Sequence, residues 1–105
     1  MISTHILDTT KGTPASGVTV ILEKRTDKGW QPVGIDKTNA DGRISYDCPK
    51  EKGVYRLTFN IEEYFKGEEF FFMNTPVVFN VKSTDRKYHV PLLLNPYGYS
   101  TYRGS

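Results

Sequence analysis

A period-two alternation of apolar and polar residues constrains the fold of this chain more than any other feature. In residues 17–24, the apolar side chains of Val18, Val20 and Leu22 would share one face of an extended chain. The residues between them fall on the opposite face, as in a strand with one face buried more deeply. The pattern therefore predicts a β-strand here.

The same kind of segment returns along the chain. Residues 3–8 form a similar first segment, and four later ones are rich in Val, Tyr, Phe and Thr: residues 30–38, 53–59, 75–81 and 86–94. Turn chemistry separates them, at Asp27-Lys-Gly29, Asn39-Ala-Asp-Gly42 and Pro49-Lys-Glu-Lys-Gly53. Seven or eight short strands at this spacing indicate a β-sandwich or barrel rather than parallel α/β units.

One segment departs from this alternation. Within residues 60–67, the apolar Ile61 and Phe65 stand four residues apart, as on one face of a helix. Asn60 can cap the start, with a glutamate three residues later, and Gly67 can end the segment. We expect a helix of one to two turns that packs onto the sandwich through Ile61 and Phe65.

Length and charge narrow the class of protein. A chain of 105 residues forms a single core, so we expect one domain over residues 1–105. Fourteen Lys and Arg against 12 Asp and Glu give a net charge of +2 without a dense basic stripe, which argues against nucleic-acid binding. No apolar run approaches the ~18 residues that a membrane span needs, and no leader follows Met1. We expect a small soluble domain with no nucleic-acid or membrane partner.

Cysteine and histidine counts bound the metal chemistry. Cys48 is the only cysteine, which rules out an intrachain disulfide and a cysteine-rich metal site. The two histidines match no zinc motif, so we expect neither a metal nor a cofactor. Cys48 precedes Pro49 with no histidine nearby in the sequence, and we interpret it as a small, partly buried residue rather than a nucleophile.

Few residues can carry acid–base chemistry. His5 and His89 are the first candidates, because an imidazole pKa of ~6.5 suits proton transfer near neutral pH. On the residues alone, each also fits a half-exposed histidine of a strand. Arg43 follows an Asp-Gly turn and alone fits a surface cation. Residues 70–72, three phenylalanines, favour core and edge packing over a ligand platform.

The last ten residues are unusually aromatic. Tyr97, Tyr99 and Thr101 would share one face of a strand, and Tyr102 and Arg103 follow where a tail is normally polar and featureless. This pattern indicates a last strand whose end has a functional role rather than a frayed tail.

Four segments together resemble the transthyretin superfamily: residues 5–20 its N-terminal signature, residues 88–101 its C-terminal signature, and residues 38–43 and 60–65 the segments between. The resemblance covers nearly the whole chain. Within the superfamily, transthyretin has Lys, Glu and Thr where this chain has His5, Arg43 and His89. The ending Tyr102-Arg-Gly-Ser105 resembles the closing tetrapeptide of the 5-hydroxyisourate hydrolase family.

This resemblance implies a fold and a reaction. The fold is an all-β, transthyretin-like (prealbumin-like) β-sandwich of two four-stranded sheets with one short helix. The reaction is the hydrolysis of a cyclic amide bond of 5-hydroxyisourate, which gives 2-oxo-4-hydroxy-4-carboxy-5-ureidoimidazoline in urate degradation. Such a ring opening needs a base for water, an oxyanion stabiliser and a proton for the leaving nitrogen.

The resemblance also implies which residues form the site. His5 and His89 would supply the base and the acid in an order the sequence leaves open, and Arg43 would hold substrate oxygens and developing negative charge. Ser105 can orient a histidine or the water, and Thr101 and Tyr102 would shape the substrate site. Family members place this site where two dimers meet, so we expect a homotetramer, a dimer of dimers with sites at the subunit interface.

Two departures and two alternatives accompany this reading. Asn95 replaces a small residue of the family, and Phe72-Met73 replaces Phe-Pro, which affects loop detail. A non-catalytic transthyretin-like carrier of small ligands would lack His5, Arg43 or His89. A structural prealbumin-like module would explain the middle of the chain but not its last 18 residues.

The single cysteine, the lack of a leader and the lack of a Ser-Lys-Leu ending favour a cytoplasmic location.

Overall fold

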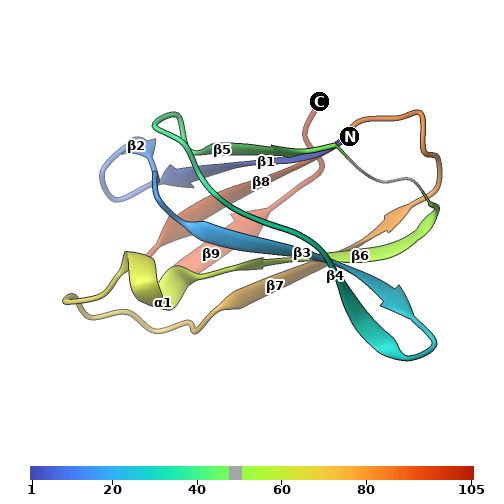
Figure 1. Cartoon of the computed structure of the whole chain (residues 1–105). Helices are drawn as coiled ribbons and strands as arrows, with labels where there is room; N and C mark the ends of the chain where they lie inside the picture. Colours follow the sequence, from blue (N-terminus) through green and yellow to red (C-terminus); the bar gives the residue numbers. More distant parts are fainter. Residues whose placement is uncertain (48–50) are drawn as a thin grey trace.

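The computed structural model describes residues 1–47 and 51–105, in which two β-sheets pack face to face (Figure 1). The elements are, in chain order, β1 (Ile2–Asp8), β2 (Thr13–Pro14), β3 (Thr19–Thr26), β4 (Gly29–Lys37), β5 (Arg43–Tyr46), β6 (Gly53–Phe59), α1 (Ile61–Tyr64), β7 (Thr75–Val81), β8 (Tyr88–Asn95) and β9 (Gly98–Thr101). The predicted strands over residues 53–59 and 75–81 are reproduced to the residue. The predicted role of Cys48 lies outside the described residues.

The sandwich is confirmed, with one difference in strand count. One sheet has the predicted four strands, which lie in the order β4-β3-β6-β7. The other, called here the first sheet, has five: β2-β1-β8-β9, with β5 also paired to β1. The extra strand is the two-residue β2, because the turn after Asp8 folds the chain back and pairs Asp8 with Thr13. All pairs are antiparallel except β1 with β8, which run parallel.

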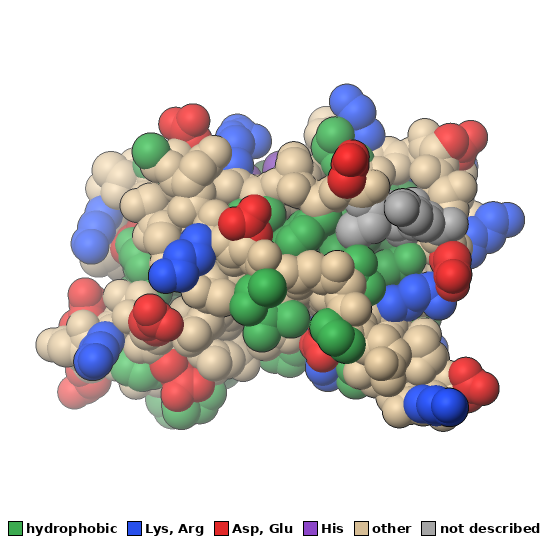
Figure 2. All heavy atoms as spheres, viewed as in Figure 1, with side chains coloured by type: hydrophobic (Ala, Val, Ile, Leu, Met, Phe, Trp, Pro, Cys, Tyr) green, Lys and Arg blue, Asp and Glu red, His purple; other side chains and the backbone are tan. Residues whose placement is uncertain are grey.

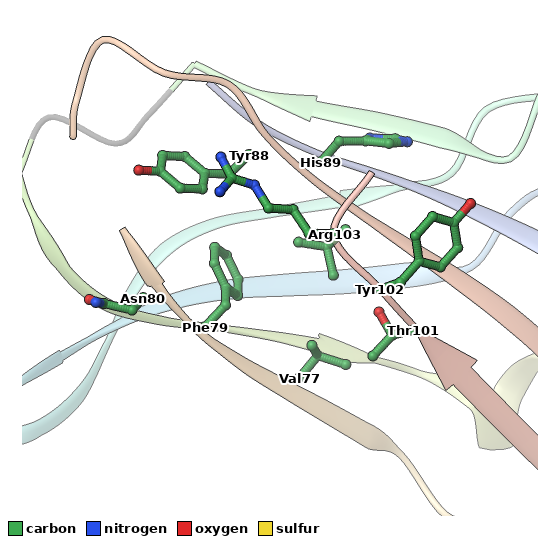
Figure 3. A pocket seen from close by; sticks show the side chains of 9 residues that line it. Val77, Phe79, Asn80, Tyr88, His89, Thr101, Tyr102 and Arg103 are labelled. Atoms are coloured by element: carbon green, nitrogen blue, oxygen red, sulfur yellow. The ribbon is translucent and has the colours of Figure 1, made fainter. Parts of the chain in front are cut away.

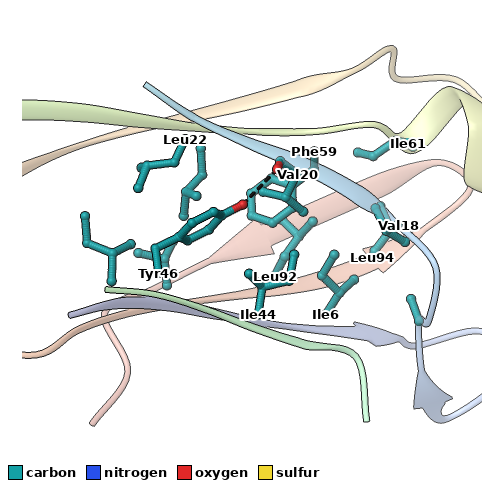
Figure 4. Close-up of a cluster of buried hydrophobic side chains, with 14 of the residues drawn as sticks. Ile6, Val18, Val20, Leu22, Ile44, Tyr46, Phe59, Ile61, Leu92 and Leu94 are labelled. Carbon is teal, nitrogen blue, oxygen red and sulfur yellow. Dashed lines mark hydrogen bonds between the residues drawn. The ribbon is translucent and has the colours of Figure 1, made fainter. Parts of the chain in front are cut away.

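The core lies between the sheets, and the alternation builds it. Val18, Val20 and Leu22 are buried, as predicted, with exposed fractions of 1% or less. Figure 4 shows them facing side chains of the first sheet, such as those of Ile6 and Leu92. The hydroxyl of Tyr46 donates to the backbone carbonyl of Val20 at 2.7 Å, which satisfies a polar group inside this apolar cluster.

The predicted helix is present as one turn. The Asn60 side chain accepts a hydrogen bond from the backbone N–H of Glu63 at 3.3 Å, which caps the first turn. Ile61 and Phe65 are both buried, as predicted.

The loop after the helix differs in part from expectation. Phe70 packs on the core and Phe72 meets the ring of Tyr99 at an edge, but 70% of Phe71 is exposed, so the packing prediction is wrong for Phe71. Its backbone N–H donates to the carbonyl of Pro96, which holds this part of the loop at the surface.

The surface mixes both signs of charge. On the face shown in Figure 2, acidic and basic side chains are interspersed, and neither sign forms a continuous block there. None of the helices in residues 1–47 and 51–105 has the length and apolar character needed to cross a membrane.

Candidate functional site

Three strands of the first sheet bring the predicted His5, Arg43 and His89 together. The core pattern decides their orientation: Ile2, Thr4, Ile6 and Asp8 of β1 are buried, so alternate residues turn to the opposite surface. We call that surface, which faces away from the core, the outer face. On the same logic Arg43 of β5 and His89 of β8 point outward.

Strand pairing fixes how close these residues lie. His5 pairs directly with Arg43 across β1 and β5. On the other side of β1, Ser3 pairs with His89 and His5 pairs with Pro91. With strands ~4.8 Å apart and ~3.3 Å per residue, the Cα atoms of His5 and His89 lie about 8 Å apart on a diagonal. The two imidazoles and the guanidinium therefore belong to one patch of the sheet.

A cleft of about 240 Å³, here the site cleft, opens on the outer face. The residues that line it are Met1, Ser3, Thr4, Arg43, Ile44, Ser45, Lys87, His89 and Ser105. Three of the four residues predicted to be catalytic, Arg43, His89 and Ser105, are among them, and His5 lies beside Arg43 through the strand pairing. The cleft thus offers hydroxyls, two cationic side chains and an imidazole to a polar ligand.

His89 is held through both its side chain and its backbone. Its Nδ1 lies 2.8 Å from the Ser3 hydroxyl oxygen, and its backbone carbonyl accepts a hydrogen bond from the Gly104 N–H at 2.8 Å. Partial burial lowers the pKa of His89 below its usual 6.5, and the electrostatic effects of nearby Arg43 and His5 lower it further. His89 is therefore mostly neutral at neutral pH, and a neutral imidazole can accept a proton.

Thr101 and Tyr102, which were predicted to shape the substrate site, line a second cleft. This edge cleft, of about 170 Å³, lies where β7, β8 and β9 meet and is lined mainly by apolar side chains (Figure 3). The Thr101 hydroxyl donates to the Pro91 carbonyl at 2.7 Å. Arg103 lies over the Tyr88 ring at 5.1 Å, while Tyr102 points away from that ring. His89 lines both clefts, so it links them.

Sequence reasoning missed Ser3, Lys87 and Gly104. Ser3 could have been found, because it stands two residues before His5 and shares its face of the strand. Lys87 and Gly104 gave no such signal, because their places depend on where β8 and the tail lie. Across residues 1–47 and 51–105, no three His, Cys, Asp or Glu side chains gather closely enough to hold a metal ion.

Comparisons with known proteins cover the whole chain. Residues 2–104 match the model of the HIUase/Transthyretin family. A 5-hydroxyisourate hydrolase of Salmonella dublin is 46% identical over 110 residues, which span 100% of this chain and 81% of the relative.

Two solved structures share the fold. The 5-hydroxyisourate hydrolase of Klebsiella pneumoniae superposes with a TM-score of 0.87 at 39% identity, over 99% of this chain and 98% of the other. Sea bream transthyretin in complex with thyroxine superposes with a TM-score of 0.90 at 32% identity, over 98% and 93%. The fold is therefore common to hydrolases and to a protein crystallised with a hormone.

Proposed function

The chain belongs to the HIUase/Transthyretin family, and we infer that it is an enzyme that hydrolyses 5-hydroxyisourate. The observation that carries this inference is the full-length similarity to named 5-hydroxyisourate hydrolases, in a chain whose outer face holds two histidines and an arginine. The reaction is a step of urate degradation, a part of purine catabolism.

The chemistry of the outer face suits this reaction. Water adds to a carbonyl carbon of the six-membered ring, the carbon–nitrogen bond breaks, and the nitrogen leaves with a proton. His5 and His89 take the roles of base and acid, because an imidazole can either accept or donate a proton. Arg43 is permanently charged and stabilises negative charge on the carbonyl oxygen as water attacks.

The tail completes this proposed site. Ser105 lines the site cleft with Arg43 and His89, where its hydroxyl can orient the water or an imidazole. Thr101 and Tyr102 line the adjoining edge cleft and limit how far a substrate can extend beyond His89. The support for assigning Ser105 to one cleft and Thr101 and Tyr102 to the other, within one site, is that His89 lines both clefts.

The assay follows the ultraviolet absorbance of freshly generated 5-hydroxyisourate, which also decays without an enzyme. We expect the protein to accelerate this decay and expect His5→Ala, Arg43→Ala and His89→Ala each to remove most of the acceleration. Decay at the spontaneous rate with the wild-type protein would refute the proposed function. Full activity in all three folded variants would instead refute the site.

The transthyretin-like carrier is the second reading, because the hormone-bound sea bream structure has the same fold. The shared fold does not distinguish a hydrolase from a ligand carrier, but the side chains at three positions do. The resemblance to transthyretin places Lys, Glu and Thr at positions 5, 43 and 89, whereas this chain has two imidazoles and a guanidinium there. The two imidazoles suit proton transfer and the guanidinium suits the stabilisation of negative charge, so the catalytic interpretation is preferred.

We also propose that the enzyme is a homotetramer, a dimer of dimers whose interface completes each site. The support is the exposed aromatic edge of the first sheet. Among residues 1–47 and 51–105, no further strand lies beside β9, which ends that sheet, and Tyr97 and Tyr102 at its two ends are 60% and 59% exposed. A second copy would cover these rings and the unpaired strand edge. Sedimentation equilibrium tests this, and a monomer mass at micromolar concentration would contradict it.

A cytoplasmic location completes the proposal. Its support is the single cysteine in 105 residues, which leaves the chain without an intrachain disulfide and so compatible with a reducing compartment. Fractionation of cells that express the protein tests this location.

A further inference from the structure

We propose that Ser3 and Gly104 are positioning residues that hold the His89 ring from two sides, with Nδ1–H donated to the Ser3 hydroxyl and the Nε2 lone pair presented to the site cleft as the base for water. This inference rests on the proposed function, since it assigns the base of that reaction. Ser3 lies on β1, and Gly104 lies in the tail after β9. Neither residue is itself required to touch the substrate.

Strand pairing places Ser3 beside His89. The two residues are direct partners in the parallel β1–β8 pair, and both side chains point to the outer face. Their polar atoms, Ser3 Oγ and His89 Nδ1, lie 2.8 Å apart, which is hydrogen-bond distance. In the described part of the chain, the Ser3 hydroxyl has no other hydrogen-bond partner. The Ser3 hydroxyl is therefore available to orient the His89 ring.

The tail contacts the ring from the side opposite Ser3. Gly104 pairs with His89 in an isolated antiparallel bridge, in which its N–H donates to the His89 carbonyl. A Cβ atom at position 104 would lie 2.5 Å from Cδ2 of the ring, closer than real Cβ contacts allow, and at a tight 3.2 Å from Cγ and 3.1 Å from Cγ of Pro91. Only glycine lets the backbone pass this near. The Nδ1 side thus bonds to Ser3 and the Cδ2 side lies next to Gly104, so in our proposal the remaining ring atoms, Cε1 and Nε2, are the ones presented to the site cleft.

The surroundings of His89 determine which nitrogen carries the proton. The charged or titratable groups around it come from both clefts: His5 on β1 and Arg43 on β5 face it across the sheet. Met1, Lys87 and Ser105 share the site cleft with it, and Tyr88, Tyr102 and Arg103 share the edge cleft. Partial burial first, then Arg43 and His5, lower the pKa of His89 against the opposing effect of hydrogen bonding with Ser3, and so favour a neutral ring, which has a single N–H. Because Ser3 occupies Nδ1, a neutral ring can act as a base only when that N–H lies on Nδ1. The Ser3 hydroxyl can accept from Nδ1–H or donate to a bare Nδ1, so the 2.8 Å contact fits both tautomers. Our proposal is the first arrangement, in which Ser3 accepts and Nε2 keeps its lone pair for water, and the tautomer measurement below decides between the two.

Ser3→Ala tests the hydroxyl, with Ser3→Thr as the conservative variant and Ser16→Ala as the control. Ser16 is an exposed serine in the turn before β3, outside both clefts. We expect Ser3→Ala to lower kcat about 10- to 100-fold with KM within about twofold, since the loss concerns orientation rather than binding. Ser3→Thr should restore most of kcat, and Ser16→Ala should match the wild type. Unchanged kcat in Ser3→Ala would overturn the proposal.

The tautomer can be read without substrate. Nitrogen-15 chemical shifts of the His89 ring, assigned by comparison with His89→Gln, should show N–H on Nδ1 in the wild type and a mixture in Ser3→Ala. A wild-type ring protonated on Nε2 would overturn the proposal even if the enzyme is active. This measurement needs no turnover, so it separates two failures. If the positioning proposal is wrong, the ring shows the other tautomer; if the proposed function is wrong, the wild-type protein does not accelerate the decay.

Gly104→Ala tests the second contact, with Gly98→Ala as its matched control. A Cβ at position 98 would meet only the Asn95 side chain, at 3.9 Å, which is ordinary contact. We expect Gly104→Ala to reduce kcat as strongly as Ser3→Ala and to move the His89 ring resonances, while its thermal unfolding stays close to that of Gly98→Ala. Wild-type kcat and ring shifts in a folded Gly104→Ala protein would show that the tail does not hold the ring.

Discussion

Replacing Gly42 with alanine should destabilise this protein by much more than the same change at Gly12. Both glycines have a left-handed backbone, with φ of 71° and 69°, so an alanine is strained at either position. Their surroundings differ. A Cβ at position 12 would have nothing within 4 Å, whereas a Cβ at position 42 would lie 2.6 Å from the backbone oxygen of Ile6. Gly42 immediately precedes Arg43, so this crowded turn also sets where Arg43 begins its strand.

The structure allows the two costs to be separated. A left-handed backbone costs a residue with a Cβ about 1–2 kcal/mol, and this cost is common to both variants. At position 42 the clash must also be relieved. The Ile6 carbonyl accepts from the Ala15 N–H at 2.9 Å, and the Ile6 N–H donates to the Gly42 carbonyl at 2.8 Å, so movement there weakens hydrogen bonds beside a fully buried residue. Losing one such bond costs about 1–3 kcal/mol. We therefore expect losses of about 2–5 kcal/mol for Gly42→Ala and about 1–2 kcal/mol for Gly12→Ala.

Urea unfolding followed by circular dichroism measures both values, at one protein concentration because association would contribute to stability. The ultraviolet assay on the folded fraction then reports on Arg43: Gly42→Ala should lose activity and Gly12→Ala should keep it. Equal destabilisation of the two variants would refute the reasoning, because it would mean that the contact with Ile6 relaxes at no cost.

Three further predictions concern other parts of the molecule. Folding lowers the pKa of His89, so between the lowered pKa and 6.5 the unfolded chain binds more protons than the folded protein. The free energy of unfolding should therefore fall as pH drops through this window. Urea unfolding at several pH values should show a weaker fall for His89→Gln than for the wild type. Tyr64→Phe should cost about 1–3 kcal/mol in thermal unfolding, because the Tyr64 hydroxyl donates at 2.7 Å to Asp8, a carboxylate only 1% exposed that would lose a partner. Deleting residues 102–105 should lower turnover about tenfold or more in the ultraviolet assay, while its urea midpoint changes little, because most of these residues are exposed.

Local pattern was sufficient to predict most strands. Val18, Val20 and Leu22 are buried because a strand places alternate residues on one side, and that depends only on neighbours in the sequence. The capped helix turn at Asn60 is local for the same reason. Strands β2 and β5 were missed because two and four residues are too few to show a period. The exposure of Phe71 was missed because it depends on a hydrogen bond to Pro96, 25 residues later.

The candidate site was harder to predict, because the contacts that form it join distant parts of the chain. Ser3 and His89 are 86 residues apart, and the parallel pairing of β1 with β8 leaves no trace in local periodicity. The three groups on the outer face were named from a family resemblance, and their spacing in the sequence gives no geometry. Residues alone left His5, Arg43 and His89 as ordinary strand and surface residues.

The same core pattern that builds the sandwich nevertheless dictates the face on which the site forms. In β8, Tyr88, Val90, Leu92 and Leu94 are all buried, so His89 must point to the outer face. Turning the strand over would expose these four apolar side chains and bury an imidazole, which core packing forbids. A slip of two residues against β1 would keep every side chain on its face yet separate His89 from its partner Ser3. Hydrophobic burial therefore selects the face, and the register selects the partner, so the hydrogen bond between Ser3 and His89 depends on the pairing of strands that the core alone leaves open.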